Sequence, residues 1–235
     1  MVFHVLNRGN AKGDIFEDAE DYLAFEKVLT DVLANFSVEL FSYCLMPNHW
    51  HLVLRPSRNG ELGRFMQRLT VTHVRRWHQR RHSTGEGHLY QGTYKSFPVQ
   101  QGDHFLTLCR YVERNALRAR LVRRAENWRW SSLWKRLYPG KPSDDEMPPL
   151  SLWPTGTPKR WVDHVNAPLT AQEIEAVETS LRRGRPLGDA AWQRKTAGAL
   201  RLGSTLRPRG RPRKEKYSSV ARSNNVLILF SDPQG

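Results

Sequence analysis

The first half of the chain alternates between two hydrophobic periodicities, and this alternation restricts the fold more than any other feature of the sequence. A period of two residues is typical of a half-buried strand, whereas a period of three to four residues is typical of a helix with one packed side. The two periods follow one another over residues 2–8, 19–36, 38–45, 49–54, 61–81, 93–100 and 103–122. Their order, β-α-β-β-α-β-α, predicts an α+β, ferredoxin-like body whose antiparallel sheet is covered by helices on one face.

Turn residues and apolar faces agree with this order. Only Met46-Pro47-Asn48 separates the second strand from the third, as in a tight hairpin. The helix over 61–81 carries Arg64, Arg68 and Arg75 opposite its apolar side. The helix over 19–36 has an apolar face made of Tyr22, Phe25, Leu29, Val32, Leu33 and Phe36. Both helices are therefore expected to pack on the sheet along one side.

Proline and charge divide the remainder of the chain. Six prolines lie between Tyr138 and Lys159, where they exclude regular helix and central strand. We therefore predict a body over residues 1–137 and a proline-rich linker over 138–159. A small basic region, mainly helical or irregular, is expected over 160–216, and a disordered tail over 217–235.

The basic charge is concentrated beyond that linker. The whole chain has a net charge of +14, and residues 182–216 alone contribute +10. A chain this basic is expected to have a polyanionic partner. The longest apolar run, Val226 to Phe230, is too short to cross a bilayer, and Cys44 and Cys109 have no metal-like spacing. We therefore expect a cytoplasmic protein without a membrane span.

Two histidines one residue apart begin the third predicted strand. Because side chains alternate along a strand, His49 and His51 point to one side of the sheet and Trp50 points to the other. Two imidazoles so placed can share a divalent cation, although ordinary half-buried histidines fit the pattern equally well. The triple-histidine strand of a nucleotide hydrolase is not favoured, because Val53 stands where its further histidine would be.

Tyr111 lies off the apolar stripe of the last predicted helix, four residues before Asn115. It can present its hydroxyl to a site where Asn115 ligates a metal or orients a phosphate. The helix pattern by itself favours a boundary tyrosine beside a surface asparagine. A site forms if this helix crosses the sheet face that carries His49 and His51, and we predict that it does.

Five blocks of sequence resemble the REP-associated tyrosine transposases, which are single-tyrosine relatives of insertion-sequence transposases in the HUH endonuclease superfamily. The resemblance covers residues 2–134 and continues through RRGRPLGDAAW and LRPRGRPRK in the basic region. The five blocks are HVLNRGN (4–10, with Ile15 and Phe16 after it), YCLMPNHWHLVL (43–54), GHLYQGTYKS (87–96), RYVERNALRARLV (110–122) and WRWSS (128–132).

The resemblance implies a metal-dependent nuclease in which His49, His51 and Asn115 hold Mg²⁺ or Mn²⁺ and Tyr111 is the nucleophile. Attack by Tyr111 on single-stranded DNA would give a 5′-phosphotyrosine, from which another 3′-hydroxyl can rejoin the strand. The implied substrate is a palindromic DNA hairpin, and the implied enzyme is a monomer at the nucleoid. The alternatives are a domesticated protein that binds such a DNA or RNA hairpin without cutting it, and a relaxase or replication initiator of the same superfamily.

Basic residues supply the predicted DNA contacts. Arg64, Arg68 and Arg75 form a backbone track, with Arg8 and Lys95 as further candidates. The segment PRGRPRK, which contains Arg209, Arg211 and Arg213, resembles the core of an AT-hook that enters the minor groove. We expect the basic region to hold the hairpin duplex while the body cuts.

Overall fold

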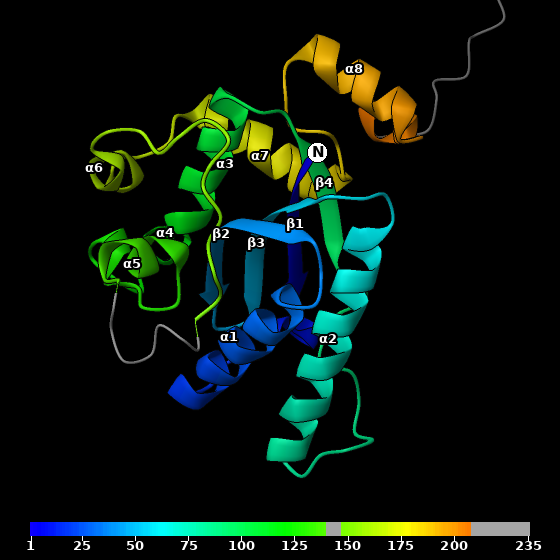
Figure 1. Cartoon of the computed structure of the whole chain (residues 1–235), viewed down its shortest axis with the longest axis vertical. Coiled ribbons are helices and arrows are strands. Elements are labelled where there is room, and N and C mark those ends of the chain that lie inside the picture. The colour runs from blue at the N-terminus through cyan, green and yellow to red at the C-terminus, as the bar shows by residue number, and fades with distance from the viewer. Residues whose placement is uncertain (140–146, 208–235) are drawn as a thin grey trace, which may run out of the picture.

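The structure, a computed structural model, describes residues 1–139 and 147–207. These residues form a four-stranded antiparallel sheet in the spatial order β2-β3-β1-β4. Its strands are β1 (Val2–Arg8), β2 (Val38–Met46), β3 (His49–Pro56) and β4 (Lys95–Val99). This strand order, with helices between β1 and β2 and between β3 and β4, is the ferredoxin-like arrangement that the periodicities predict. Figure 1 shows the sheet at the centre of the molecule.

Two long helices cover one face of the sheet. These are α1 (Ala19–Leu33) and α2 (Glu61–Arg80), and they pack against each other and against a cluster of buried side chains. Trp50 is fully buried in this cluster, as the alternation along the third strand predicts. The predicted apolar face of the 19–36 segment is confirmed: all of its side chains lie in or against this cluster.

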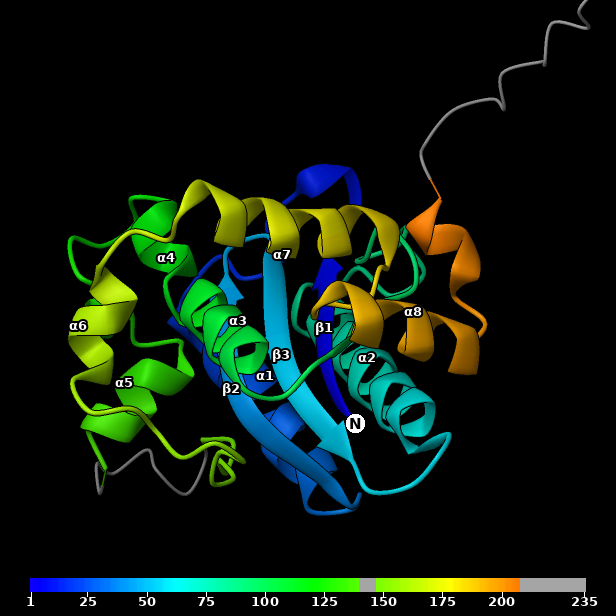
Figure 2. The same ribbon diagram turned by 90° about the horizontal axis from the view of Figure 1, so that it is seen from above.

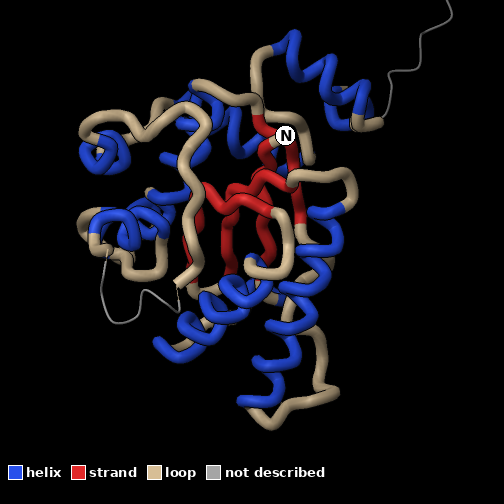
Figure 3. Tube along the Cα trace, viewed as in Figure 1, coloured by secondary structure: helices blue, strands red, loops and turns tan. Residues whose placement is uncertain are grey.

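The second face of the sheet is covered as well, so the prediction of helices on one face is wrong. Phe41, Val53 and Phe97 are buried on this face and need apolar partners. Figure 2 shows α3 and α7 in front of the sheet and α1 and α2 behind it, and Figure 3 shows the strands between helices. The additional helices are α3 (Asp103–Glu113), α4 (Asn115–Arg118), α5 (Ser132–Leu137), α6 (Trp161–Asn166), α7 (Ala171–Arg183) and α8 (Ala190–Ala199).

The C-terminal part shares the core of the body. In the segment that follows residue 147, Ser151 N–H donates to the carbonyl of Leu40 at 2.8 Å. Trp153 Nε1–H donates to the carbonyl of Phe41, also on the edge strand β2, at 2.8 Å. One hydrophobic cluster runs from Val2 to Leu187 and includes residues of the predicted linker and of the basic region. The predicted boundaries therefore mark changes in composition, but the core is continuous across them. The predicted tail and Arg209, Arg211 and Arg213 lie outside the described residues.

A buried carboxylate fixes α3 to its neighbours. Glu113 has no exposed surface and accepts hydrogen bonds from Ser132 Oγ at 2.6 Å and Ser42 Oγ at 3.1 Å. Trp161 Nε1–H of α6 donates to the other oxygen, Oε2, at 2.7 Å, and the Arg136 guanidinium of α5 binds Oε1, the oxygen that the two serines share. Burial of a charge is tolerated only when its oxygens are paired in this way. The end of α3 is thereby held firmly over the sheet.

The last helix of the body differs from its prediction. The segment expected to be one helix over 103–122 divides at Arg114 into α3 and α4. In the described part of the chain, no helix is both long enough and apolar enough to cross a membrane.

Candidate active site

The two histidines lie where β3 begins, beside β1. In the β1–β3 ladder His49 pairs with Arg8 and His51 pairs with Leu6. The ring centroids of His49 and His51 are 5.0 Å apart, with the ring planes nearly perpendicular. Both side chains lie on the sheet face that α3 covers, as predicted.

These histidines open onto a cavity of about 740 Å³. Its walls come from β1, β3, the segment before β4, α3, α4 and α7. The lining residues are Leu6, Asn7, Arg8, His49, His51, Gln91, Gly92, Thr93, Tyr94, Lys95, Tyr111, Arg118, Leu181 and Arg182. The predicted nucleophile and the histidine pair therefore line the same cavity.

Burial keeps the imidazoles in their neutral form. It lowers the pKa of His49 to about 4, with the charges of Arg8 and Arg118 acting in the same direction. The pKa of His51 lies well below its ordinary value, again chiefly because of burial. A neutral imidazole has a lone pair to offer a metal ion, so both side chains are ready to act as ligands at neutral pH.

The hydrogen bonds of the pair leave one nitrogen of each ring for such an ion. His49 Nδ1 is 2.7 Å from Asn48 Oδ1, and His51 Nδ1 is 2.9 Å from Nε2 of His4 on β1. A metal-binding histidine usually has its second ring nitrogen engaged in this way, which sets the tautomer and the ring orientation. The two residues therefore fit a divalent cation through Nε2.

His4 is a site residue that the sequence did not reveal. It is fully buried, and its ring stacks on that of His51 with centroids 5.0 Å apart. The sequence shows that His4 lies in the first predicted strand, but it does not show which residues of the third strand lie beside it. The β1–β3 register brings His4 next to His51.

Asn115 is buried one turn after Tyr111. Its side-chain amide donates to the carbonyl of Tyr111 at 3.4 Å, and it does not line the cavity. Asn115 begins α4, directly after the interruption of the helix at Arg114. Among the described residues, no group of three His, Cys, Asp or Glu side chains could hold a metal ion.

Tyr111 reaches the cavity from the last turn of α3. Its side chain is nearly buried, and its ring meets the edge of His51 at a centroid distance of 6.2 Å. Arg118 Nη2 donates to the Tyr111 hydroxyl oxygen at 2.8 Å, and the guanidinium carbon is 4.6 Å from the ring centre. Burial raises the pKa of Tyr111, while the charge of Arg118 opposes that rise.

The predicted DNA contacts fall into two groups. Arg8 and Lys95 are exposed and line the cavity itself. Arg75 lines a second cavity of about 630 Å³, which shares Asn7 and residues 91–94 with the first. Arg64 and Arg68 are exposed on the same helix, α2, but line neither cavity.

Comparisons with known proteins agree with this geometry. A family model described as "Transposase IS200 like" matches residues 1–115, which include both histidines, Tyr111 and Asn115. The search of curated proteins gives no match.

Two solved structures are similar in fold. One is described as a REP-associated tyrosine transposase bound to a REP hairpin; it is 13% identical over 66% of this chain and 89% of that chain, with a TM-score of 0.49. The other is a putative transposase from Deinococcus radiodurans R1, 18% identical over 52% of this chain and 85% of that chain, with a TM-score of 0.38.

Proposed function

We propose that this chain is an IS200-like transposase, the family whose model matches residues 1–115, and that it cuts single-stranded DNA with Tyr111 and transfers the cut strand. One observation carries the proposal. Tyr111 from α3 and His51 from β3 meet in one cavity, with ring centroids 6.2 Å apart. Because both come from one chain, no second copy is needed to bring them together, which supports action as a monomer.

The chemistry follows from the tyrosine. Its hydroxyl oxygen attacks a backbone phosphorus, the bond from phosphorus to the 3′-oxygen breaks, and the products are a 5′-phosphotyrosine and a free 3′-hydroxyl. The phosphotyrosine conserves the energy of the broken bond, so another DNA 3′-hydroxyl can displace Tyr111 and rejoin the strand without ATP. The proposed reaction is therefore nicking followed by strand transfer.

A divalent cation fits the histidine pair. His49 and His51 would hold Mg²⁺ or Mn²⁺ through Nε2, and nitrogen ligands favour Mn²⁺ of the two. When bound, the cation would supply positive charge beside the non-bridging oxygens of the phosphate. Asn115 would add an amide oxygen only if its side chain turned away from the Tyr111 carbonyl, to which it is bonded here.

The proposed substrate is a palindromic DNA hairpin at the nucleoid, by the resemblance of the five sequence blocks. Arg8 and Lys95 would bind phosphates at the cavity, and Arg75 would bind the flanking strand in the neighbouring cavity. Arg64 and Arg68 would extend that track along α2. Arg209, Arg211 and Arg213 would contact the duplex from the basic region.

A covalent adduct tests the proposal. We expect purified protein, Mn²⁺ and labelled hairpin DNA with a single-stranded flank to give a denaturant-resistant complex, which Tyr111→Phe abolishes. Tyr94→Phe is the matched control, because Tyr94 lines the same cavity. An adduct lost with Tyr94→Phe but kept with Tyr111→Phe would reassign the nucleophile. Tight hairpin binding with no adduct under any metal would favour the binding protein instead.

A further inference from the structure

Arg118 is the side chain that holds the Tyr111 hydroxyl. One guanidinium nitrogen, Nη2, donates to the hydroxyl oxygen at 2.8 Å, and the guanidinium carbon lies 4.6 Å from the centre of the ring. The group is therefore bonded to the oxygen that would attack phosphorus. Because an arginine stays protonated, its charge opposes the effect of burial on an oxygen that becomes negative.

A residue of the basic region restrains Arg118 in turn. The other guanidinium nitrogen, Nη1, donates to Glu178 Oε1 at 3.1 Å. Both side chains are about 41% exposed, so without this contact Arg118 would keep much of its rotamer freedom. The ion pair thus fixes the long Arg118 side chain in the direction that brings Nη2 to the Tyr111 hydroxyl.

Glu178 is carried by a helix that is itself firmly placed. In α7, Val177 and Ser180 are buried, and Glu173 binds the nearly buried Arg110 of α3 at 3.3 Å. One turn after Glu178, Leu181 and Arg182 line the cavity. The C-terminal region therefore forms one wall of the site that contains Tyr111.

We propose that Arg118 is a catalytic residue that binds the Tyr111 oxygen and stabilises its negative charge during attack, and that Glu178 is a positioning residue that aims Arg118 from α7. This inference rests on the proposed function. Arg118 keeps its own protons throughout. The phenol proton passes to water in the cavity, and the departing 3′-oxygen takes a proton from water to become the 3′-hydroxyl. The guanidinium also remains beside the oxygen when the strand is rejoined, so it assists both directions of the reaction.

Single-turnover kinetics separate this role from DNA binding. We expect Arg118→Gln to slow adduct formation at saturating DNA by about 100-fold to 1000-fold, the usual loss of one preorganised charge donor. The dissociation constant for the hairpin should change far less, and Arg118→Lys should restore part of the rate. Arg123→Gln is the matched control, because it removes an exposed arginine that does not line the cavity.

A double-mutant cycle tests Glu178. We expect Glu178→Gln to slow adduct formation by about tenfold alone and to have no further effect when combined with Arg118→Gln, because contacting residues are not additive. Asp163→Asn serves as the control, since Asp163 forms a surface ion pair with Arg160 elsewhere in the same region. An equal loss in both backgrounds would show that Glu178 only docks α7, which overturns its positioning role.

Other outcomes separate the two proposals. If Arg118→Gln weakens hairpin binding but leaves the rate of adduct formation unchanged, Arg118 is a phosphate contact and the inference is wrong, while the proposed function stands. If the wild-type protein forms no adduct, the proposed function fails. In that case, the contacts of Arg118 with Tyr111 and Glu178 are tested by the free energies of unfolding of the single and double variants. The inference is wrong if there is no coupling free energy between Arg118→Gln and Tyr111→Phe, or none between Arg118→Gln and Glu178→Gln.

Discussion

At the scale of single residues, a hydrogen-bonded pair of imidazoles supports the cavity. His4 is bonded to His51 through Nε2, and its other ring nitrogen, Nδ1, is buried with no hydrogen-bond partner among the described residues. An unpaired buried polar atom is costly, so an apolar residue would suit this position better for stability alone. Binding of a cation through His51 Nε2 requires that His51 Nδ1 carry the proton and donate it to His4. His4 therefore sets the state in which His51 can be a ligand.

Replacement of His4 should weaken metal binding. We expect His4→Phe, which keeps the ring but removes the acceptor, to lower the affinity for Mn²⁺ by about 10-fold to 100-fold. Calorimetric titration of the DNA-free protein with Mn²⁺ measures this directly. His164→Ala is the control, because His164 is exposed on α6. Unchanged Mn²⁺ affinity in a folded His4→Phe protein would show that His4 only fills space.

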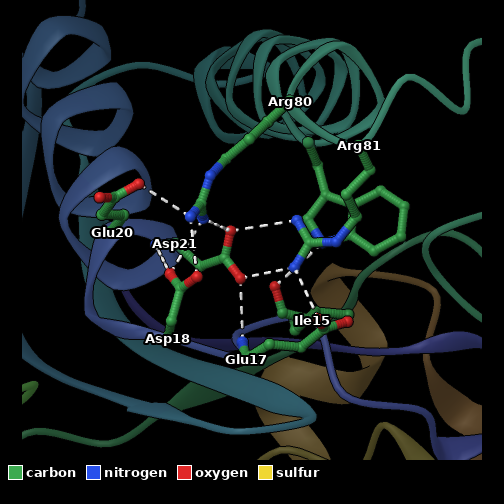
Figure 4. A network of polar contacts seen from close by, with 8 residues as sticks. Ile15, Glu17, Asp18, Glu20, Asp21, Arg80 and Arg81 are labelled. Atoms are coloured by element: carbon green, nitrogen blue, oxygen red, sulfur yellow. Dashed lines mark hydrogen bonds and ion pairs between the residues drawn. The ribbon is translucent and has the colours of Figure 1, made fainter.

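At the scale of elements, a cluster of charges joins the two helices beneath the sheet. Arg80 and Arg81 follow one another at the end of α2 and bind Asp21, which is almost fully buried at the start of α1, at 2.5 and 2.6 Å (Figure 4). Asp18, which caps α1, and Glu20 also bind Arg80. Acidic groups at a helix start and basic groups at a helix end complement the helix dipoles as well. The cluster fixes the helix that carries Arg64, Arg68 and Arg75.

This cluster should make stability depend on pH. Burial raises the pKa of Asp21, but the hydrogen bonds and charges of Arg81 and Arg80 outweigh it, so the pKa is lowered overall. The hydrogen bond from Arg80 lowers the pKa of Asp18 to about 2. Carboxylates with a lowered folded-state pKa stabilise the fold above their unfolded pKa of about 3.9 and lose that contribution as pH falls through the folded value. We expect the free energy of unfolding to fall between about pH 4 and pH 2.

The variant Asp21→Asn should remove much of that dependence. It should lower the free energy of unfolding at pH 7 by on the order of 2 kcal/mol, after allowance for the partial exposure of the two guanidinium groups. Urea denaturation at a series of pH values measures both effects. Asp31→Asn is a matched control, because Asp31 and Arg76 form an exposed pair at 3.5 Å between the same helices. A variant as acid-sensitive as the wild type would exclude Asp21 as the cause.

At the scale of the whole molecule, the described part of the basic region shares the core of the body. Trp161 of α6 is nearly buried, contacts Trp153 at a ring distance of 4.9 Å and donates to Glu113 of α3. The segment after α7 continues this attachment, because Leu187 exchanges backbone hydrogen bonds with Pro98 and Gln100 beside β4. The described part of the basic region and the residues proposed to cut DNA therefore belong to one folded unit.

A single substitution in this region should destabilise the entire protein. We expect Trp161→Ala to lower the free energy of unfolding by about 3–5 kcal/mol, because it opens a cavity and removes a partner of the buried Glu113. Thermal unfolding followed by circular dichroism should show one transition, shifted as a whole. Leu152→Ala is the control, since Leu152 is 92% exposed. Two separate transitions, with only one of them shifted, would mean that the region folds independently.

Part of the site could be predicted from sequence. Tyr111 is predicted off the apolar stripe of its helix, but it belongs to the buried cluster on that face of the sheet and lines the cavity from there. His49 and His51 are placed on one side of the sheet by the two-residue period of a strand. The side of the sheet on which the two histidines lie follows from the residues directly next to them in the chain. The sequence places Arg118 two turns after Tyr111, but nothing in it shows that the Arg118 guanidinium would donate to the Tyr111 hydroxyl. Asn115 is predicted beside the histidines, and in the structure its side-chain amide is bonded to the carbonyl of Tyr111.

The sequence by itself determined the order of the four strands and of the two helices between them, and the buried side of the helix over 19–36, because hydrophobic periodicity is a local property that reports which side of an element leaves water. Only the tertiary structure decided which elements meet. The β1–β3 register brings His4 to His51, and the packing of α7 on α3 brings Glu178 to Arg118. The tertiary structure also decided that helices cover the second face of the sheet. Such contacts depend on how faces distant in the chain fit together, and periodicity within one segment carries no information about that fit.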